Sequence, residues 1–470
     1  MAGYRRFAKN IGVLTLANFG TKILSFLLVP LYTSVLTTAE YGTYDLVSNT
    51  IVLIIPLLTQ NVVDAVLRFT MDDDIYKGSV LGIGIKHFLM SLIPMVILLE
   101  LNSVLGLFPQ LVELTPFVML MYISQSLSGM LIYHAQGLDR FSDIAISSVI
   151  CSGLVIVCNI VFLLPLEMGL DGYFLANVIG PLVQTAYLGV RIRLSGERMQ
   201  FGDRQLEREM LVYSRPLIAN NIAWWVNNVS DRYIVTFFCG VSVNGIYSVA
   251  SRIPSILSVV QSIVNQAWTI SAVNEYDPED SNGFFSNMYA GYNCIMTVLC
   301  SLIIVFNMLL AHVLYANEFF AAWQYAPFLT IAVVFGALAG YIGGILAAVK
   351  DTKQFARSTV VGAIANIVLN FAAVPILGPI GSAAATLISF WLTWFMRVRT
   401  LKRYINMKMR LGRDYASYAL LVVQGIVLLV VPNLVVAHLI EVILFGLVLT
   451  LYLRELKTGW AKVVSFCKNR

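Results

Sequence analysis

Residues 215–266 read RPLIANNIAWWVNNVSDRYIVTFFCGVSVNGIYSVASRIPSILSVVQSIVNQ. This stretch is apolar enough to cross a membrane twice, yet its first half carries asparagines, Asp231 and Arg232. A fixed charge at mid-bilayer costs about 2.5–3.5 kcal/mol on insertion scales, so such residues normally face a bundle interior or a water-filled cavity. The stretch therefore predicts a polar cavity, lined by Arg232 and Arg252, inside a membrane transporter.

The composition is that of a polytopic helical membrane protein. Of the 470 residues, 58% are hydrophobic and 12% are charged, and the mean hydropathy is +0.79. An average soluble domain is about 25% charged. The apolar segments are continuous and about 20 residues long, which is the length of a membrane-spanning helix. They do not alternate as the strands of a membrane β-barrel would.

We predict fourteen membrane spans, an even number that puts both termini on one side. Of the 31 Lys and Arg, Lys22, Arg232 and Arg252 lie inside spans, and the others, Arg397 among them, belong to that side. By the positive-inside rule that side is the cytoplasm. The approximate limits of the spans are 10–36, 44–68, 80–101, 115–137, 144–165, 172–192, 213–238, 244–270, 284–311, 326–349, 357–377, 380–400, 415–434 and 437–454.

The two halves of the chain repeat one another weakly. Gly42-x-Tyr44 and Gly245-x-Tyr247 each follow an outward turn in equivalent places. Parallel repeats related by an axis along the membrane normal are a known transporter plan, with the substrate site between the lobes. We expect a six-helix lobe at 1–195, a cytoplasmic amphipathic linker at 196–212, a second six-helix lobe at 213–403, and an additional two-helix hairpin with a cytoplasmic tail at 404–470.

Polar residues inside the predicted spans are the candidate site. Three cations against Asp64 and Asp231 leave an excess of positive charge, which suits an anionic ligand. The guanidinium fork of Arg suits phosphate. Asp64 can also pair with Arg68 one helical turn later, and buried salt bridges and interhelical hydrogen bonds remain the alternative interpretation. The polar residues that we expect to line the cavity are Asn18, Asn221, Trp225, Asn228, Ser248, Ser255 and Gln266.

Other functional classes lack their sequence signals. The sequence has no GxxxxGK[ST], HExxH or GxSxG motif and no CxxC pair. We therefore expect no catalytic residues, no cofactor and no metal site. The net charge of +5 comes from basic residues between apolar segments, so we expect no nucleic-acid partner.

The sequence resembles the polysaccharide-exporter branch of the multidrug/oligosaccharidyl-lipid/polysaccharide exporter superfamily, which includes the bacterial Wzx-type flippases for O-antigen and capsule units. The resemblance is carried by Asn18-Phe-Gly-Thr-Lys22, by the turn Leu36-Thr-Thr-Ala-Glu-Tyr-Gly-Thr-Tyr44, and by paired G-x-x-G turns at Gly169 and Gly378. It implies an all-α fold with two six-helix lobes around a central cavity that opens alternately inward and outward. Lys22 and Arg252 stand where first-span and eighth-span cations occur in related lipid flippases.

The resemblance also implies a substrate and a location. We expect a transporter of an undecaprenyl-pyrophosphate-linked oligosaccharide in the bacterial cytoplasmic membrane. Lys22, Arg232 and Arg252 would bind the head-group phosphates, and Asp64 and Asp231 are candidate ion-coupling acids. Membrane lipids and the glycan polymerase machinery are the expected partners. A cation-coupled multidrug antiporter is the alternative. A membrane glycan polymerase or ligase is less favoured, because such an enzyme would carry a long outward loop with Arg or His.

Overall fold

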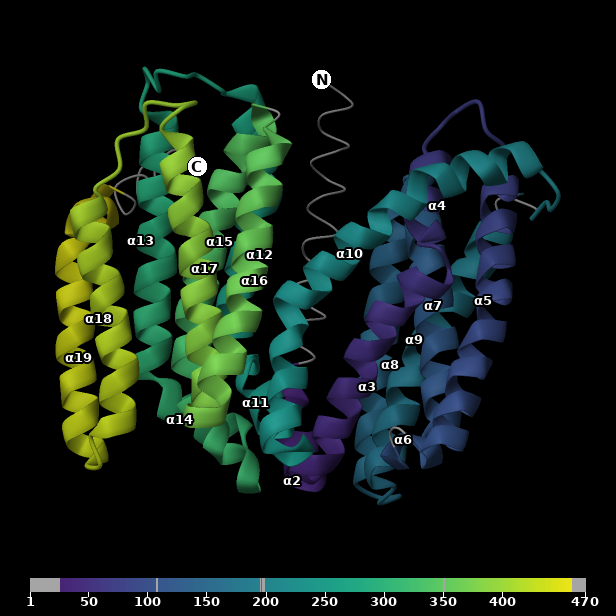
Figure 1. The fold of residues 1–470 in the computed structure, drawn as a ribbon, viewed down its shortest axis with the longest axis horizontal. Helices are drawn as coiled ribbons and strands as arrows, with labels where there is room; N and C mark the ends of the chain where they lie inside the picture. The colour runs from purple at the N-terminus through teal and green to yellow at the C-terminus, as the bar shows by residue number, and fades with distance from the viewer. Residues whose placement is uncertain (1–25, 107–108, 195, 197–198, 350, 459–470) are drawn as a thin grey trace, which may run out of the picture. The chain divides into compact units, whose positions relative to one another are not determined.

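The computed structural model describes residues 26–106, 109–194, 196, 199–349 and 351–458 (Figure 1). Within these ranges every regular element is a helix. Eleven helices of the described chain are long and apolar enough to cross a membrane. The all-helical, multi-pass fold class is therefore confirmed, whereas the count of fourteen spans is not.

Three predicted spans have no counterpart among the eleven helices. The segment 10–36 lies mostly outside the described residues. The segment 213–238 falls within helix α10 (Arg204–Cys239), and the segment 244–270 is divided between α11 (Val241–Ala250) and α12 (Arg252–Asn274). The latter two segments carry polar and charged residues in their interiors, which lowers their hydropathy.

The chain divides into two compact units, Met1–Val229 and Ser230–Arg470. In the first unit α9 packs against α7 and α8. The helix α3 begins at a capping box, in which Thr37 Oγ1 accepts from the Glu40 N–H and the Glu40 carboxylate accepts from the Thr37 N–H. The helices of this unit are α2 (Val29–Val35), α3 (Thr38–Leu58), α4 (Val62–Thr70), α5 (Lys77–Leu105), α6 (Pro109–Glu113), α7 (Thr115–Gly137), α8 (Phe141–Leu163), α9 (Gly169–Leu194) and the first part of α10.

The predicted span 44–68 is not one helix, because the chain breaks between α3 and α4. Gln60 and Asn61 both adopt the left-handed conformation, each with φ 55°. Asn tolerates this region better than most residues with a side chain. The Gln60 carbonyl accepts from the Ser214 hydroxyl of α10 at 2.9 Å, so a backbone group freed by the break is satisfied by a second helix.

The second unit repeats the packing of the first, since α17 packs against α15 and α16 as α9 does against α7 and α8. Its core contains stacked aromatic rings, such as Trp268 on Tyr341 with 3.9 Å between centroids. Besides the end of α10, α11 and α12, its helices are α13 (Phe284–Val305), α14 (Asn307–Leu314), the 3₁₀ helix η1 (Asn317–Gln324), α15 (Ala326–Ala348), α16 (Thr352–Leu377), α17 (Pro379–Leu401), α18 (Leu411–Val430) and α19 (Leu434–Leu451).

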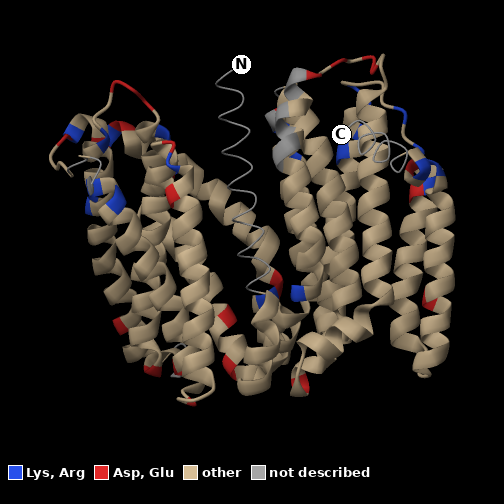
Figure 2. Cartoon of the chain, turned by 180° about the vertical axis from the view of Figure 1, so that it is seen from behind, with Lys and Arg blue, Asp and Glu red and all other residues tan. Residues whose placement is uncertain are grey.

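Basic and acidic residues are unevenly distributed along the helices of each unit. Figure 2 shows Lys and Arg gathered at one end of each unit and mainly Asp and Glu at the other. At the basic end of the first unit, Lys86 forms an ion pair with Glu207 at 2.7 Å, and Arg191 forms one with Asp143 at 2.9 Å. The hydrogen bond from Lys86 lowers the pKa of Glu207. This contact fastens the start of α10 to α5.

Arg397, assigned to the cytoplasmic side from the sequence, is a buried cation. It lies in α17 and is only 5% exposed. Its guanidinium donates to Ser358 Oγ at 3.0 Å, to the Ala339 carbonyl at 2.6 Å and to Thr359 Oγ1 at 2.9 Å. The buried charge is thus solvated by neutral oxygens of α15 and α16, and it fastens three helices together.

Candidate functional site

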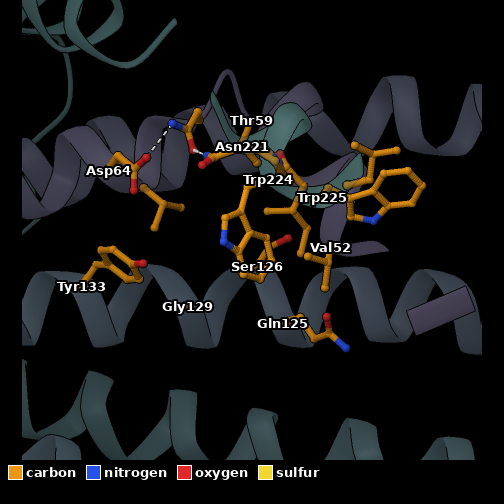
Figure 3. Close-up of a pocket in the computed structure, with 15 residues that line it drawn as sticks. Val52, Thr59, Asp64, Gln125, Ser126, Gly129, Tyr133, Asn221, Trp224 and Trp225 are labelled. Atoms are coloured by element: carbon orange, nitrogen blue, oxygen red, sulfur yellow. Dashed lines mark hydrogen bonds between the residues drawn. The ribbon is translucent and has the colours of Figure 1, made fainter. Parts of the chain in front are cut away.

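A cavity of about 240 Å³ opens beside the break between α3 and α4 in the first unit (Figure 3). It is walled by α3, α4, α7 and the part of α10 before Val229. Its lining is mixed, with polar groups from every wall and two tryptophan rings from α10. The labelled lining residues are Val52, Thr59, Asp64, Gln125, Ser126, Gly129, Tyr133, Asn221, Trp224 and Trp225.

A short hydrogen-bonded chain connects α10 to the acid of this cavity. The Asn221 amide donates to Asn61 Oδ1 at 3.0 Å, and the Asn61 amide donates to Asp64 Oδ2 at 2.7 Å. The left-handed backbone of Asn61 brings its side chain between the two. Asp64 does not form the pair with Arg68 that their spacing allows: no ion pair joins them among the described residues, and Arg68 is exposed.

The tryptophans of α10 differ in what they offer a ligand. The Trp225 indole N–H donates to the Asn49 carbonyl of α3 at 2.8 Å, so the donor of this predicted cavity residue already bonds a second helix. The neighbouring Trp224 ring is 62% exposed and lines the cavity. Asn228 is also exposed, with its amide donating to the Trp224 carbonyl at 2.7 Å. Trp224 was not selected from the sequence, because adjacent residues of a helix point in different directions and Trp225 was placed on the cavity face.

In the second unit Asp231 is held by hydroxyl groups of two other helices. Tyr247 of α11 donates to Asp231 Oδ2 at 2.8 Å, and Thr386 of α17 approaches the same oxygen at 3.5 Å. Ser382 Oγ of α17 donates to the Tyr247 hydroxyl at 3.1 Å. The sequence singled out Asp231 and the Gly-x-Tyr247 turn separately, and the structure brings them together.

Arg232 and Arg252 belong to the same unit and are both half-buried. Arg232 lies in α10, and Arg252 is the first residue of α12. Between them lies α11, which meets α10 at Gly240, whose φ of 90° permits the turn. Arg232 lies eight residues before Gly240, and Arg252 lies twelve residues after it.

The segment that carries the predicted cavity residues Ser248, Arg252 and Ser255 is not one continuous helix. The helix breaks at Ser251, three residues before Pro254, whose missing N–H removes a helical hydrogen bond. Ser248 is buried, and Ser255 donates to the Arg252 carbonyl at 2.5 Å. Asn18, Lys22 and the side chain of Gln266 lie outside what the structure describes.

The fold and the buried polar groups define a class, a multi-pass helical membrane protein with the fold of MurJ and MATE transporters. The lipid II flippase MurJ in an inward closed conformation superposes with a TM-score of 0.68 at 15% identity, covering 96% of this chain and 99% of that one. An inward-facing multidrug resistance MATE family transporter of the MOP superfamily gives 0.60 at 15% identity, over 83% of this chain and 96% of that one.

The chain belongs to the polysaccharide biosynthesis protein family, which matches residues 7–269. A curated relative is the probable low-salt glycan biosynthesis flippase Agl15 of Haloferax volcanii, 23% identical over 225 residues. That match spans 47% of each protein, about half the length of the relative. The family resemblance deduced from the sequence is confirmed.

Proposed function

We propose that this protein is a flippase that moves a lipid-linked oligosaccharide across a membrane. In its specific form, the substrate is an undecaprenyl-pyrophosphate-linked unit that passes from the inner to the outer leaflet of a bacterial cytoplasmic membrane, for O-antigen or capsule synthesis. Alternating access of the two units would carry the head group. The family and the fold shared with the lipid II flippase MurJ support the proposal.

The observation that carries the proposal is the pair of half-buried cations inside predicted membrane spans, Arg232 in α10 and Arg252 at the start of α12. Two cations inside membrane helices are costly unless the protein supplies a polar surrounding or a ligand supplies negative charge. A pyrophosphate does so, and charge-assisted hydrogen bonds are about twice as strong as neutral ones. Lys22, in the segment outside the described residues, would be the third phosphate-binding cation.

The membrane potential favours this direction of transport. An inside-negative potential moves an anionic head group outward with about 2.3 kcal/mol per charge per 100 mV. A neutral sugar portion needs a different kind of contact. In the first unit Asn221, Asn228 and the exposed Trp224 offer amides and an aromatic face, which are suited to sugar hydroxyls and ring faces.

Asp231 is the stronger of the two candidate coupling acids. It already has Tyr247 and Thr386 hydroxyls around one carboxylate oxygen, so a proton or a small cation bound there would find oxygen ligands in place. Asp64 borders an open cavity and accepts from the Asn61 amide. Coupling through either acid would let an ion gradient drive the return of the empty carrier.

The test is export of a surface glycan by a flippase-deficient strain that expresses this protein. We expect the unaltered protein to restore export and Arg232→Ala to fail while it accumulates normally in the membrane. Arg68→Ala is the matched control, because Arg68 is exposed at the end of α4. Failure of the unaltered protein across strains with different pyrophosphate-linked glycans would contradict the proposal.

A cation-coupled multidrug antiporter is the second candidate, favoured by the fold shared with MATE transporters and by the two acids. Such a protein should confer resistance to cationic dyes that depends on Asp64 or Asp231. Dye efflux without any glycan export would replace the flippase by the antiporter. The two phenotypes are scored in the same strains.

A further inference from the structure

The hairpin α18–α19 carries a buried acid for which the transport proposal has no use. Glu441 of α19 is fully buried, and neither carboxylate oxygen has a hydrogen-bond partner among the described residues. It is the eighth residue of an 18-residue apolar helix that packs against α13 and α18. A carboxylate in such surroundings is costly unless it is paired or takes up a proton.

The neighbours of Glu441 are neutral. Gln424 of α18 donates to its backbone carbonyl at 3.5 Å, and Ser301 of α13 donates to Gln424 Oε1 at 2.7 Å. The sequence of α13 has no charged residue, and α18 has only Arg413 and Asp414, at its far end. His438, one turn away on α19, is exposed. Within the described chain, no cation is placed to neutralise Glu441.

Polar groups continue from Glu441 toward the basic end of the hairpin. On α13, Asn293, Thr297 and Ser301 follow at four-residue spacing and so share one face. All three are fully buried. Thr297 donates to Asn293 Oδ1 at 3.1 Å, and Tyr418 of α18 donates to the same oxygen at 3.0 Å. One amide thus joins α13 to α18.

The line of polar groups ends at an ion-pair cluster. Ser417 and Tyr452 share a hydrogen bond of 3.0 Å between their hydroxyls. Next to them, Arg413 pairs with Asp414 at 2.9 Å and with Glu455. We call the whole set the hairpin seam: Glu441, Gln424, Ser301, Thr297, Asn293, Tyr418, Ser417, Tyr452, Asp414, Arg413 and Glu455.

Unsatisfied atoms recur along the hairpin seam. Besides both Glu441 oxygens, they are Asn293 Nδ2, Asp414 Oδ2 and Glu455 Oε2. Buried polar atoms of this kind are usually satisfied by ordered water. Hydroxyls and water both donate and accept, so in sequence they can pass protons, and the Asn293 amide oxygen holds two of the hydroxyls in place. Hydrogen bonding between helices does not by itself require unsatisfied polar atoms at several successive positions along the hairpin seam.

We propose that Glu441 is a proton-binding site, neutral within the membrane, and that the hairpin seam exchanges its proton with the basic end of α18 and α19. A metal cation is a poorer occupant, because it needs several oxygen ligands and the described neighbours offer few. The site is separate from Arg232, Arg252 and Asp231, and the proposal does not depend on what the protein transports.

Infrared spectroscopy of the full-length protein in lipid tests the site directly. At neutral pH we expect a carboxylic-acid C=O band that disappears in Glu441→Gln and is unchanged by Na⁺. An unchanged band in Glu441→Gln would show that the acid is ionised and would overturn the proposal. Loss of the band on adding Na⁺ would also overturn it, in favour of a metal cation.

The rate at which that band shifts after transfer to D₂O tests the seam. We expect Asn293→Leu to slow the shift about tenfold, as a barrier raised by about 1.4 kcal/mol would. The matched control is Asn159→Leu, because Asn159 of α8 is also buried and also has one unsatisfied amide atom, its oxygen, but lies in the other unit. Thr297→Val repeats the test if Asn293→Leu does not accumulate. Equal rates in seam and control variants, or no shift at all, would overturn the exchange route.

Discussion

In the second unit, Arg252 and Asp231 have two different proposed roles. Arg252 offers a guanidinium from the first turn of α12, whereas Asp231 offers a carboxylate that Tyr247 and Thr386 approach. The first suits an anionic head group and the second a small cation or proton. The two roles can be separated by substitution.

The shape of the Arg252 side chain should matter as well as its charge. We predict that Arg252→Ala abolishes glycan export while the protein still accumulates in the membrane. Arg252→Lys should recover part of the activity, because it keeps the charge and loses the fork. Lys22→Ala should behave as Arg252→Ala does. Export is measured together with membrane level, and full export by Arg252→Ala at normal level would remove the phosphate-binding role.

Asp231→Asn should separate substrate binding from coupling. The amide keeps the size of the side chain and accepts from Tyr247, but it cannot take up a proton or balance a cation. We predict that the variant binds the lipid-linked glycan with unchanged affinity and loses transport. Asp64→Asn is the comparison. If both variants transport normally with an ion gradient and after its collapse, coupling through these acids is excluded.

The sequence predicted which single residues would be unusual, but not their partners. Asp231 and Arg252 stand out because a charge in an apolar segment is rare and costly. Ser382 and Thr386 do not stand out, since hydroxyls are ordinary in membrane helices, and only packing of α17 brings them to Tyr247 and Asp231. The burial of Arg397 was not predicted for the same reason: its acceptors are a carbonyl and hydroxyls from α15 and α16.

At the scale of elements, the apolar helices were predicted well and the interruptions were not. Periodicity continues across Gln60 and Asn61, so 44–68 was predicted as one span. The left-handed break becomes visible only with Ser214 and Asn221 of α10, which bond to it. The linker 196–212 was expected to be an amphipathic connector, and from Arg204 onward it is helical and continuous with the seventh predicted span.

Close contact between α12 and α15 depends on a glycine. A Cβ at Gly344 would lie 2.8 Å from Trp268 Cδ1, and the Trp268 indole N–H is bonded to the Tyr341 carbonyl at 2.7 Å. We predict that Gly344→Ala destabilises the protein by about 1–3 kcal/mol, the usual cost of overpacking.

The matched control for this helix contact is Gly446→Ala in α19, where an added Cβ meets nothing within 4 Å. It should change stability by no more than about 0.5 kcal/mol. Thermal unfolding in one detergent compares the two variants with the unaltered protein. Equal unfolding midpoints for Gly344→Ala and Gly446→Ala would show that α12 and α15 shift to accommodate the added methyl group, and would contradict the prediction.

At the scale of the whole molecule, the predicted membrane topology depends on the distribution of Lys and Arg. Lys and Arg gather at one end of each unit (Figure 2), and we predict that this end faces the cytoplasm together with both termini. Reporter fusions test this, and two reversed positions would contradict the arrangement. The predicted outward positions are Asn102, Asp171, Gly240 and Pro379, and the predicted inward positions are Gly78, Gln200, Asp280 and Arg410.

The most direct test of the central claim is a transport measurement with the purified protein in liposomes. A fluorescent lipid-pyrophosphate oligosaccharide is placed in one leaflet, and its arrival in the other is followed by protection from a membrane-impermeant quencher. We predict transfer by the unaltered protein, loss of transfer in Arg252→Ala, and no transfer of a cationic dye. Movement of the dye, with the glycan lipid remaining in its original leaflet, would contradict the flippase account.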